Sequence, residues 1–226
     1  MIATPVIIVN FKTYERGYGA KALSLTKILQ KVAFETKASV AVAVCPTDIG
    51  VISKECSLPV FAQHIDAVGF GSHTGHILPE AVKEAGAIGT LINHSERRLT
   101  LADIEECVKR AKEVDLITCV CTNDMNTSKA ASLFNPDFVA VEPPELIGGD
   151  ISVSKAQPEL VKGTVDAVKS VSPKVKVLCG AGVKNGEDVR KALELGSEGV
   201  LLASGVVAAK DVEGAMRDLI NGLGGA

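Results

Sequence analysis

The chain has 226 residues, a net charge of −3 and a pI near 5.9, and 46% of its residues are hydrophobic. This length suits one large α/β domain or two small ones. The acidic balance argues against non-specific nucleic-acid binding, which needs a basic face. No apolar run approaches the roughly 18 residues that span a bilayer. The N-terminal MIATPVIIVN lacks the basic region of a signal peptide, so we expect a cytoplasmic protein without membrane or nucleic-acid partners.

The apolar residues gather in eight short runs that lack polar alternation. Strands buried on both faces have this pattern, and it favours a parallel sheet. We expect the strands at residues 6–9, 40–44, 60–63, 89–92, 116–120, 138–141, 175–178 and 199–202.

Helical patterns lie between many of these runs. In 19–37, one apolar stripe contains Ala22, Leu25, Ile28, Leu29 and Val32. Further helices are expected at 100–114, 158–171 and 185–196, and a last one from about residue 210.

Strand and helix alternating eight times in one compact chain is typical of a (β/α)8 barrel. An open doubly wound sheet is the alternative, but it usually has fewer strands, and here no GxGxxG follows the first strand. No linker or composition shift divides the chain, so we expect a single TIM-barrel domain over residues 1–226. The units after the second and fifth strands are short, which predicts reduced or missing helices there.

In such a barrel, the chemistry lies at the carboxyl ends of the strands. Polar residues and glycines follow six of the eight runs, so a cation, an imidazole, a carboxylate and two glycine-rich turns are expected at one rim. These residues are Asn10, Phe11, Lys12, Gln63, His64, Asn93, His94, Ser95, Glu96, Arg97, Arg98, Glu142, Gly180, Gly182, Ala203, Ser204 and Gly205.

The residue types at this rim predict a proton-transfer site. Glu142 can act as a general base in a dry pocket. His94 stands where a helix could begin, which would keep its ring neutral and able to polarise a carbonyl. Lys12 supplies positive charge, while Gly182 and the 203–204 turn offer N–H groups to a phosphate. Together they indicate proton abstraction beside a carbonyl in a small phosphorylated sugar.

The motifs NFK, HSERR, AVEPPELIG, CGAGV and GVLLAS occur in this order, and the chain resembles triosephosphate isomerase, in its shorter archaeal-type form, from end to end. The resemblance implies interconversion of dihydroxyacetone phosphate and D-glyceraldehyde 3-phosphate through an enediolate, in glycolysis and gluconeogenesis. It implies neither a metal nor an organic cofactor. The catalytic residues that it implies are Glu142, His94, Lys12, Asn10 and Glu96, and the substrate-binding residues are Asn10, Phe11, Lys12, Ile147, Gly148, Gly182, Ala203 and Ser204.

The resemblance also implies a homo-oligomer, a tetramer rather than a dimer, with the Gly-rich loop 63–76 and its Thr74 at the interface. Two departures from the family pattern stand out. The tip of the loop after Glu142 continues with Gly149 and Asp150, where the family usually has threonine and then glycine. The 203–204 turn is Ala-Ser where many members have two glycines.

Two other functions remain as alternatives. A Schiff-base aldolase on the same barrel needs a lysine in the pocket, usually at the end of the sixth strand, where this chain has Glu142. A non-catalytic barrel would bind a phosphorylated ligand without exchanging a substrate proton with solvent. The six cysteines show no zinc-site spacing and are interpreted as buried thiols; they are Cys45, Cys56, Cys107, Cys119, Cys121 and Cys179.

Overall fold

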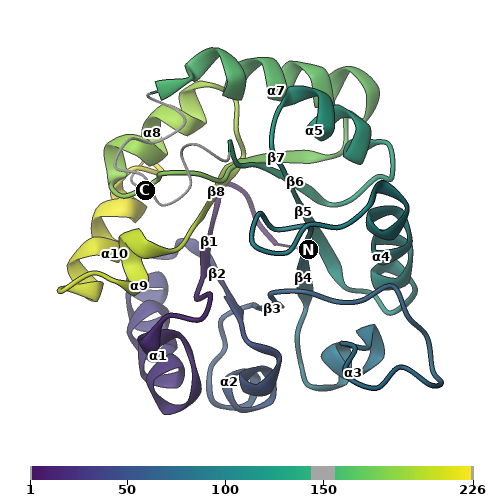
Figure 1. Cartoon of the computed structure of the whole chain (residues 1–226). Helices are drawn as coiled ribbons and strands as arrows, with labels where there is room; N and C mark the ends of the chain where they lie inside the picture. The colour runs from purple at the N-terminus through teal and green to yellow at the C-terminus, as the bar shows by residue number, and fades with distance from the viewer. Residues whose placement is uncertain (1, 144–155, 225–226) are drawn as a thin grey trace.

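A computed structural model describes residues 2–143 and 156–224, and within them eight parallel strands close into a barrel (Figure 1). Each strand pairs with the next one along the chain, and β8 pairs with β1 to complete the ring. The strands are β1 (Val6–Asn10), β2 (Ser39–Val44), β3 (Val60–Ala62), β4 (Gly89–Ile92), β5 (Ile117–Thr122), β6 (Phe138–Val141), β7 (Lys176–Cys179) and β8 (Gly199–Leu202). The predicted (β/α)8 barrel is confirmed.

The strands are apolar throughout because they pack on both faces. Side chains alternate between the two faces of a strand, so Ile8 points into a cluster inside the barrel with Phe61 and Leu201. Its neighbours Ile7 and Val9 belong to the larger cluster between strands and helices. All three β1 side chains are fully buried. A strand covered in this way needs no polar alternation.

Helices surround the barrel in Figure 1. They are α1 (Gly19–Thr36), α2 (Ile49–Glu55), α3 (Pro79–Glu84), α4 (Leu101–Glu113), α5 (Met125–Ser132), α7 (Pro158–Val171), α8 (Gly186–Glu194), α9 (Ser204–Val207) and α10 (Val212–Asn221), with 3-10 turns η1 (Glu15–Gly17) and η2 (Pro46–Asp48). The short helices predicted after the second and fifth strands are confirmed as α2 and α5, and α3 is short as well. Of the predicted apolar stripe of α1, Ala22, Leu25, Leu29 and Val32 are buried, whereas Ile28 is 37% exposed.

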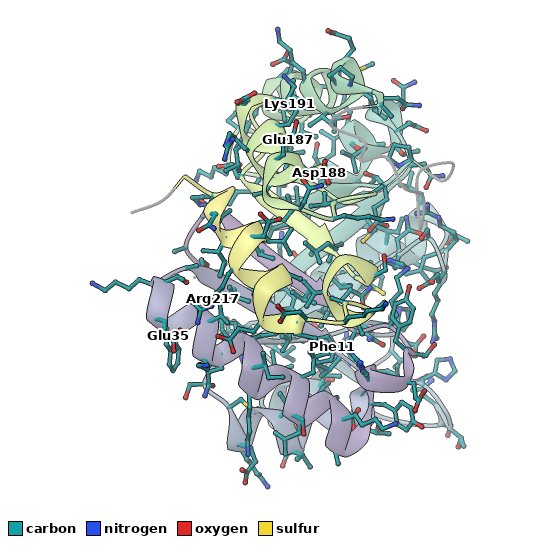
Figure 2. The ribbon with its side chains drawn as sticks, turned by 90° about the vertical axis from the view of Figure 1, so that its left-hand side faces the viewer. Phe11, Glu35, Glu187, Asp188, Lys191 and Arg217 are labelled. Carbon is teal, nitrogen blue, oxygen red and sulfur yellow. The ribbon has the colours of Figure 1, made fainter. Side chains whose placement is uncertain are left out.

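The first and last helices are joined by ion pairs. Figure 2 shows Arg217 of α10 beside Glu35 of α1, with which it forms an ion pair. Arg217 also pairs with Glu213 at 2.7 Å, and Glu213 with Lys31 of α1 at 3.0 Å. This network links the two ends of the chain. None of the helices in the described residues combines the length and the apolar character needed to cross a membrane.

Candidate active site

One pocket opens at the carboxyl ends of the strands, where the sequence predicts the chemistry. Its walls come from the segments that follow β1, β4, β6, β7 and β8. The residues that line it are Asn10, Lys12, Tyr14, His94, Glu142, 180–184 and 201–204. Seven of the predicted site residues therefore meet here: Asn10, Lys12, His94, Glu142, Gly182, Ala203 and Ser204. Ile147 and Gly148, and the departures at Gly149 and Asp150, lie outside the described residues.

Glu142 is the buried acid of this pocket. Its backbone N–H donates to the Thr122 carbonyl at 2.7 Å, and the residue is only 2% exposed. Its Oε1 lies 3.7 Å from Nε2 of His94. Its Oε2 has no hydrogen-bond partner among the residues that the structure describes. Burial raises the pKa of Glu142 to about 7, although the charges of Lys12 and Arg98 act in the opposite direction. Such a carboxyl can both accept and return a proton near neutral pH.

A glycine at the end of β7 makes room for this acid. A Cβ added to Gly180 would lie 2.5 Å from Cγ of Glu142 and 3.1 Å from the Val141 carbonyl oxygen. Any side chain at position 180 would therefore displace the carboxyl. Gly180, the first glycine of the CGAGV motif, therefore sets the position of the Glu142 carboxyl, which follows the neighbouring strand β6.

His94 faces Glu142 as a neutral ring. Its Nδ1 accepts the backbone N–H of Glu96 at 3.2 Å, which places the ring proton on Nε2, the atom nearer Glu142. Burial, together with the charge of Lys12, lowers the pKa of His94 to about 4. The prediction that a helix begins at His94 is wrong, because α4 starts at Leu101 with Thr100 as its N-cap. Burial, rather than a helix dipole, keeps the ring neutral.

A turn closed on Asn93 orients His94. Asn93 has a left-handed backbone, with φ of 61°, a conformation that few residues other than glycine adopt. Its side-chain amide donates to the Cys121 carbonyl at 2.8 Å, and its Oδ1 accepts the Leu99 N–H at 2.8 Å. Arg98 donates to the Asn93 carbonyl at 2.9 Å. Sequence reasoning placed Asn93 and Arg98 at the rim but gave them no role; their role is to hold the turn that carries the imidazole.

Lys12 is held by its backbone as well as its side chain. Its φ of 48° is also left-handed. Its N–H donates to Oδ1 of Asn10 at 3.0 Å, and its carbonyl accepts Nε2 of Gln63 at 3.0 Å. Its Nζ forms an ion pair with Oε1 of Glu96 at 3.0 Å. Non-glycine residues are held in such a backbone conformation chiefly at functional sites. Gln63 supports Lys12 through this hydrogen bond from outside the pocket. Its position after β3 is the only feature of the sequence that pointed to it.

Two predicted residues do not line the pocket. Phe11 is fully buried in the cluster between strands and helices, so its side chain does not face the pocket. It follows Asn10 on β1, and alternation turns it away from the pocket. Glu96 has a side chain that is 59% exposed and lies in the neighbouring groove. It reaches the site through Lys12 and through the N–H that it gives to His94.

The glycine-rich turns form the remaining wall. Gly182 has φ of 69°, and Ala203 is the N-cap of α9, with φ of −135° and ψ of −80°. Both turns belong to neighbouring strands, β7 and β8. Within the described residues, no group of three or more His, Cys, Asp or Glu side chains is placed to hold a metal ion.

The fold and the pocket together define a class of protein. A (β/α)8 barrel that brings a buried carboxyl, a neutral imidazole and an ammonium group to one rim has the layout of an enzyme that moves a proton beside a carbonyl.

Comparisons with known proteins identify the family. A family model described as triosephosphate isomerase matches residues 5–222. The triosephosphate isomerases of Methanocaldococcus jannaschii and Archaeoglobus fulgidus are each 56% identical to this chain, covering 95% of it and 98% and 96% of their own lengths. A structure of triosephosphate isomerase from Bartonella henselae matches with a TM-score of 0.72 at 19% identity, over 88% of this chain and 92% of the other, which shows the fold alone. The chain belongs to the triosephosphate isomerase family.

Proposed function

We propose that this chain interconverts dihydroxyacetone phosphate and D-glyceraldehyde 3-phosphate, a step shared by glycolysis and gluconeogenesis. The observation that carries the proposal is the pair formed by buried Glu142 and neutral His94, whose Oε1 and Nε2 atoms are 3.7 Å apart in one pocket. A glutamate base with a neutral histidine is the established pairing of this family. A three-carbon substrate that lies against this pair can contact both groups.

Each group has a defined role in the proposed reaction. Ionised Glu142 removes a proton from C1 of dihydroxyacetone phosphate, while Nε2–H of His94 donates a hydrogen bond to the C2 carbonyl oxygen. Negative charge develops on that oxygen, and the ammonium of Lys12 stabilises it. Protonated Glu142 then returns the proton to C2 as the hydroxyl proton leaves O1 for O2. Atoms and charge balance without an external oxidant, so the proposal includes no metal or cofactor.

Binding is assigned to the groups around this pair. Gly182 and the turn at Ala203 and Ser204 are proposed to donate backbone N–H groups to the phosphate, and Asn10 to bind substrate beside Lys12. Ile147 and Gly148 are proposed phosphate contacts because of the family resemblance alone. Glu96 is proposed as a positioning residue, since it touches Lys12 and His94 rather than the pocket.

The deciding experiment is a coupled assay of the purified chain with dihydroxyacetone phosphate, repeated in deuterated water. The proposal expects rapid formation of D-glyceraldehyde 3-phosphate, with solvent deuterium at the carbon that receives the proton. Binding of the substrate without deuterium uptake would support the non-catalytic barrel instead. Labelling of a lysine by borohydride in the presence of a ketose phosphate would support the Schiff-base aldolase.

We further infer a homo-oligomer, a tetramer rather than a dimer, with loop 63–76 at an interface. Phe70 in that loop is 80% exposed, which is unusual for a large aromatic side chain. Leu101 at the start of α4 and Leu133 after α5 are further exposed apolar side chains, at 55% and 58%. Light scattering tests this: a monomer contradicts the proposal, and a dimer contradicts its finer part.

The proposed function includes a domain range and a cellular location. We infer that residues 1–226 act as one domain, which the ion pairs between α1 and α10 support. All six cysteines, which lie in the described residues, are thiols rather than disulfides, and this supports a cytoplasmic location, where thiols stay reduced.

A further inference from the structure

The end of β5 has a buried pair of hydroxyl groups that the proposed reaction does not use. Oγ1 of Thr122 lies 2.6 Å from Oγ of Ser128, and the two residues are 1% and 0% exposed. Thr122 is the last residue of β5, and Ser128 belongs to α5, which packs against β5 and β6 (Figure 1). The pair therefore joins the end of a strand to the helix that covers it.

The direction of these hydrogen bonds follows from the protons available. Oγ of Ser128 lies 2.6 Å from the Asp124 carbonyl oxygen, and Oγ1 of Thr122 lies 3.3 Å from the Ala140 carbonyl oxygen. Each hydroxyl has a single proton to donate. Donation by Ser128 to Asp124, and by Thr122 to Ser128, satisfies both of the 2.6 Å contacts. The hydroxyl of Thr122 is thus committed to α5, whose N-cap is Asp124.

The backbone of Thr122 in turn holds the proposed base. Its carbonyl accepts the N–H of Glu142 at 2.7 Å, and on the other side of β6 the Val141 carbonyl accepts the N–H of Gly180 at 3.0 Å. Oε2 of Glu142 has no hydrogen-bond partner among the described residues. The position of this carboxyl therefore depends mainly on its backbone and on packing, and the end of β5 fixes one side of that backbone.

We propose that Thr122 is a positioning residue for the proton transfer. Its hydroxyl fixes the end of β5 on α5, so that its carbonyl holds Glu142 where the carboxylate reaches the substrate carbon. The inference rests on the proposed function and adds to it a residue that does not touch the substrate. A misplacement of about 1 Å costs on the order of 10²-fold in rate, so a smaller shift at the end of β5 is already measurable.

The test compares Thr122→Val and Thr122→Ser with the wild-type enzyme and with Thr118→Val. Valine is close to threonine in shape but lacks the hydroxyl, which serine keeps. Thr118 is a matched control, because it is a fully buried threonine on the same strand whose hydroxyl donates to Asp137 at the amino end. Thr122→Val is expected to lower kcat about tenfold, with KM and inhibition by inorganic phosphate within about twofold. Thr122→Ser should stay within about threefold of the wild-type kcat.

A double variant separates positioning from a general loosening of the barrel. If Thr122 acts through the Glu142 carboxylate, adding Thr122→Val to Glu142→Asp should lower kcat by less than about twofold more, because that carboxylate is already misplaced. Thr118→Val should lower the thermal midpoint but leave kcat unchanged. A wild-type kcat in Thr122→Val, a similar loss of kcat in Thr118→Val, or a full further loss in the double variant would each overturn the proposal.

A second variant breaks the same pair from the helix. Ser128→Ala removes the acceptor of the Thr122 hydroxyl and leaves that hydroxyl only the Ala140 carbonyl at 3.3 Å. This variant decides the question if Thr122→Val does not fold. Its kcat is expected to fall about fivefold with KM unchanged, and a wild-type kcat would refute the role of the pair.

The proposal and the function on which it rests fail in different ways. If the wild-type enzyme does not turn over dihydroxyacetone phosphate, the proposed function is wrong. An NMR titration of isotope-labelled glutamate carboxyls then still decides the role of Thr122, because it follows Glu142 without substrate. Burial raises the pKa of Glu142 to about 7, and a carboxyl released from its position is better hydrated. Its pKa should therefore fall in Thr122→Val but not in Thr118→Val, and a wild-type pKa in both variants would refute the proposal.

Discussion

The two ends of the barrel differ in how fully an acidic side chain is hydrogen-bonded. At the amino end, Oδ2 of Asp137 accepts the N–H and the hydroxyl of Thr118, at 2.8 and 2.9 Å, and Oγ1 of Thr118 accepts the Asp137 N–H at 2.9 Å. At the carboxyl end, Glu142 is 2% exposed, and its Oε2 has no hydrogen-bond partner in the part of the chain described. Glu142, the acid in the pocket, therefore has fewer hydrogen bonds than Asp137 at the opposite end.

The difference shows how one fold separates stability from function. A buried carboxyl with too few partners destabilises the folded state, and residues in left-handed backbone conformations, here Lys12 and Asn93, add strain. Lys12, Asn93 and Glu142 lie at the rim where ligands bind, while the hydrogen bonds between Asp137 and Thr118 stabilise the opposite rim. Changes at the carboxyl end should therefore affect rate, and changes at the amino end should affect stability.

The largest effect is expected for Glu142→Asp. Shortening the arm by one methylene moves the carboxylate away from the carbon that loses its proton, and a misplacement of about 1 Å costs on the order of 10²-fold in rate. We expect kcat to fall about 10²- to 10³-fold in the coupled assay. Affinity for inorganic phosphate, measured as competitive inhibition, should stay near the wild-type value.

This pair of measurements isolates the role of the base. Near-normal turnover in Glu142→Asp would remove Glu142 from the reaction. A loss of phosphate affinity equal to the loss of rate would instead indicate that the substitution had distorted the pocket as a whole.

Lys12→Ala should have the next largest effect, and on binding and rate together. In the proposed reaction its ammonium group stabilises the developing negative charge, and removing one such group typically costs about 10²-fold or more. We expect kcat/KM to fall by at least that factor and inhibition by inorganic phosphate to weaken. An unchanged inhibition constant would show that Lys12 does not contact the anion.

Much of the fold could be predicted because the apolar runs are nearly uninterrupted. Residues 89–92, 138–141 and 199–202 form strands with the predicted bounds, because short apolar runs between helical patterns are typical of strands buried on both faces. Helix α7 also begins and ends where Pro158 and the apolar pattern predict. The exposure of Ile28 could not be predicted as easily, because it lies at the edge of an amphipathic stripe.

The residues that line the site could be predicted, but the hydrogen bonds that hold them in place could not. Strand ends converge in a barrel, so Glu142, His94 and Lys12 could be brought together from their positions in the chain. The alternation of side chains along β1 separates Asn10 from Phe11, so the burial of the Phe11 side chain outside the pocket could have been predicted. The hydrogen bond that Gln63 donates to the Lys12 carbonyl follows from loop geometry, which the sequence does not specify.

Glu142→Gln should stabilise the enzyme at high pH while abolishing its turnover. The pKa of Glu142 is about 7 in the folded enzyme, against a reference value of 4.5. As pH rises from 4.5 to 7, the unfolded chain has released this proton while the folded one still binds it, so the free energy of unfolding falls across that window. The full difference corresponds to about 3 kcal/mol.

Chemical denaturation at two pH values tests this. At pH 8, Glu142→Gln should exceed the wild type in free energy of unfolding by about 2 kcal/mol, and near pH 4.5 the two should be similar. The pKa of His94 is lowered in the folded state, so neutral His94 contributes stability that is lost as pH falls from about 6.5 towards 4. This loss is expected in the wild type and in Glu142→Gln. An equal difference at both pH values would argue against burial of the charge as the cause.

The smallest effect is expected at the opposite end, for Asp137→Ala. This change leaves the N–H and hydroxyl of Thr118, a fully buried residue, without their carboxylate partner, at a cost of about 1–2 kcal/mol. The thermal midpoint should fall by about 4 °C, while kcat and KM stay unchanged. Asp137→Asn is the matched control, because it keeps an acceptor oxygen and should recover most of the loss. A fall in kcat with Asp137→Ala would show that the two ends of the barrel are coupled, since no substrate group reaches the amino rim in the proposed reaction.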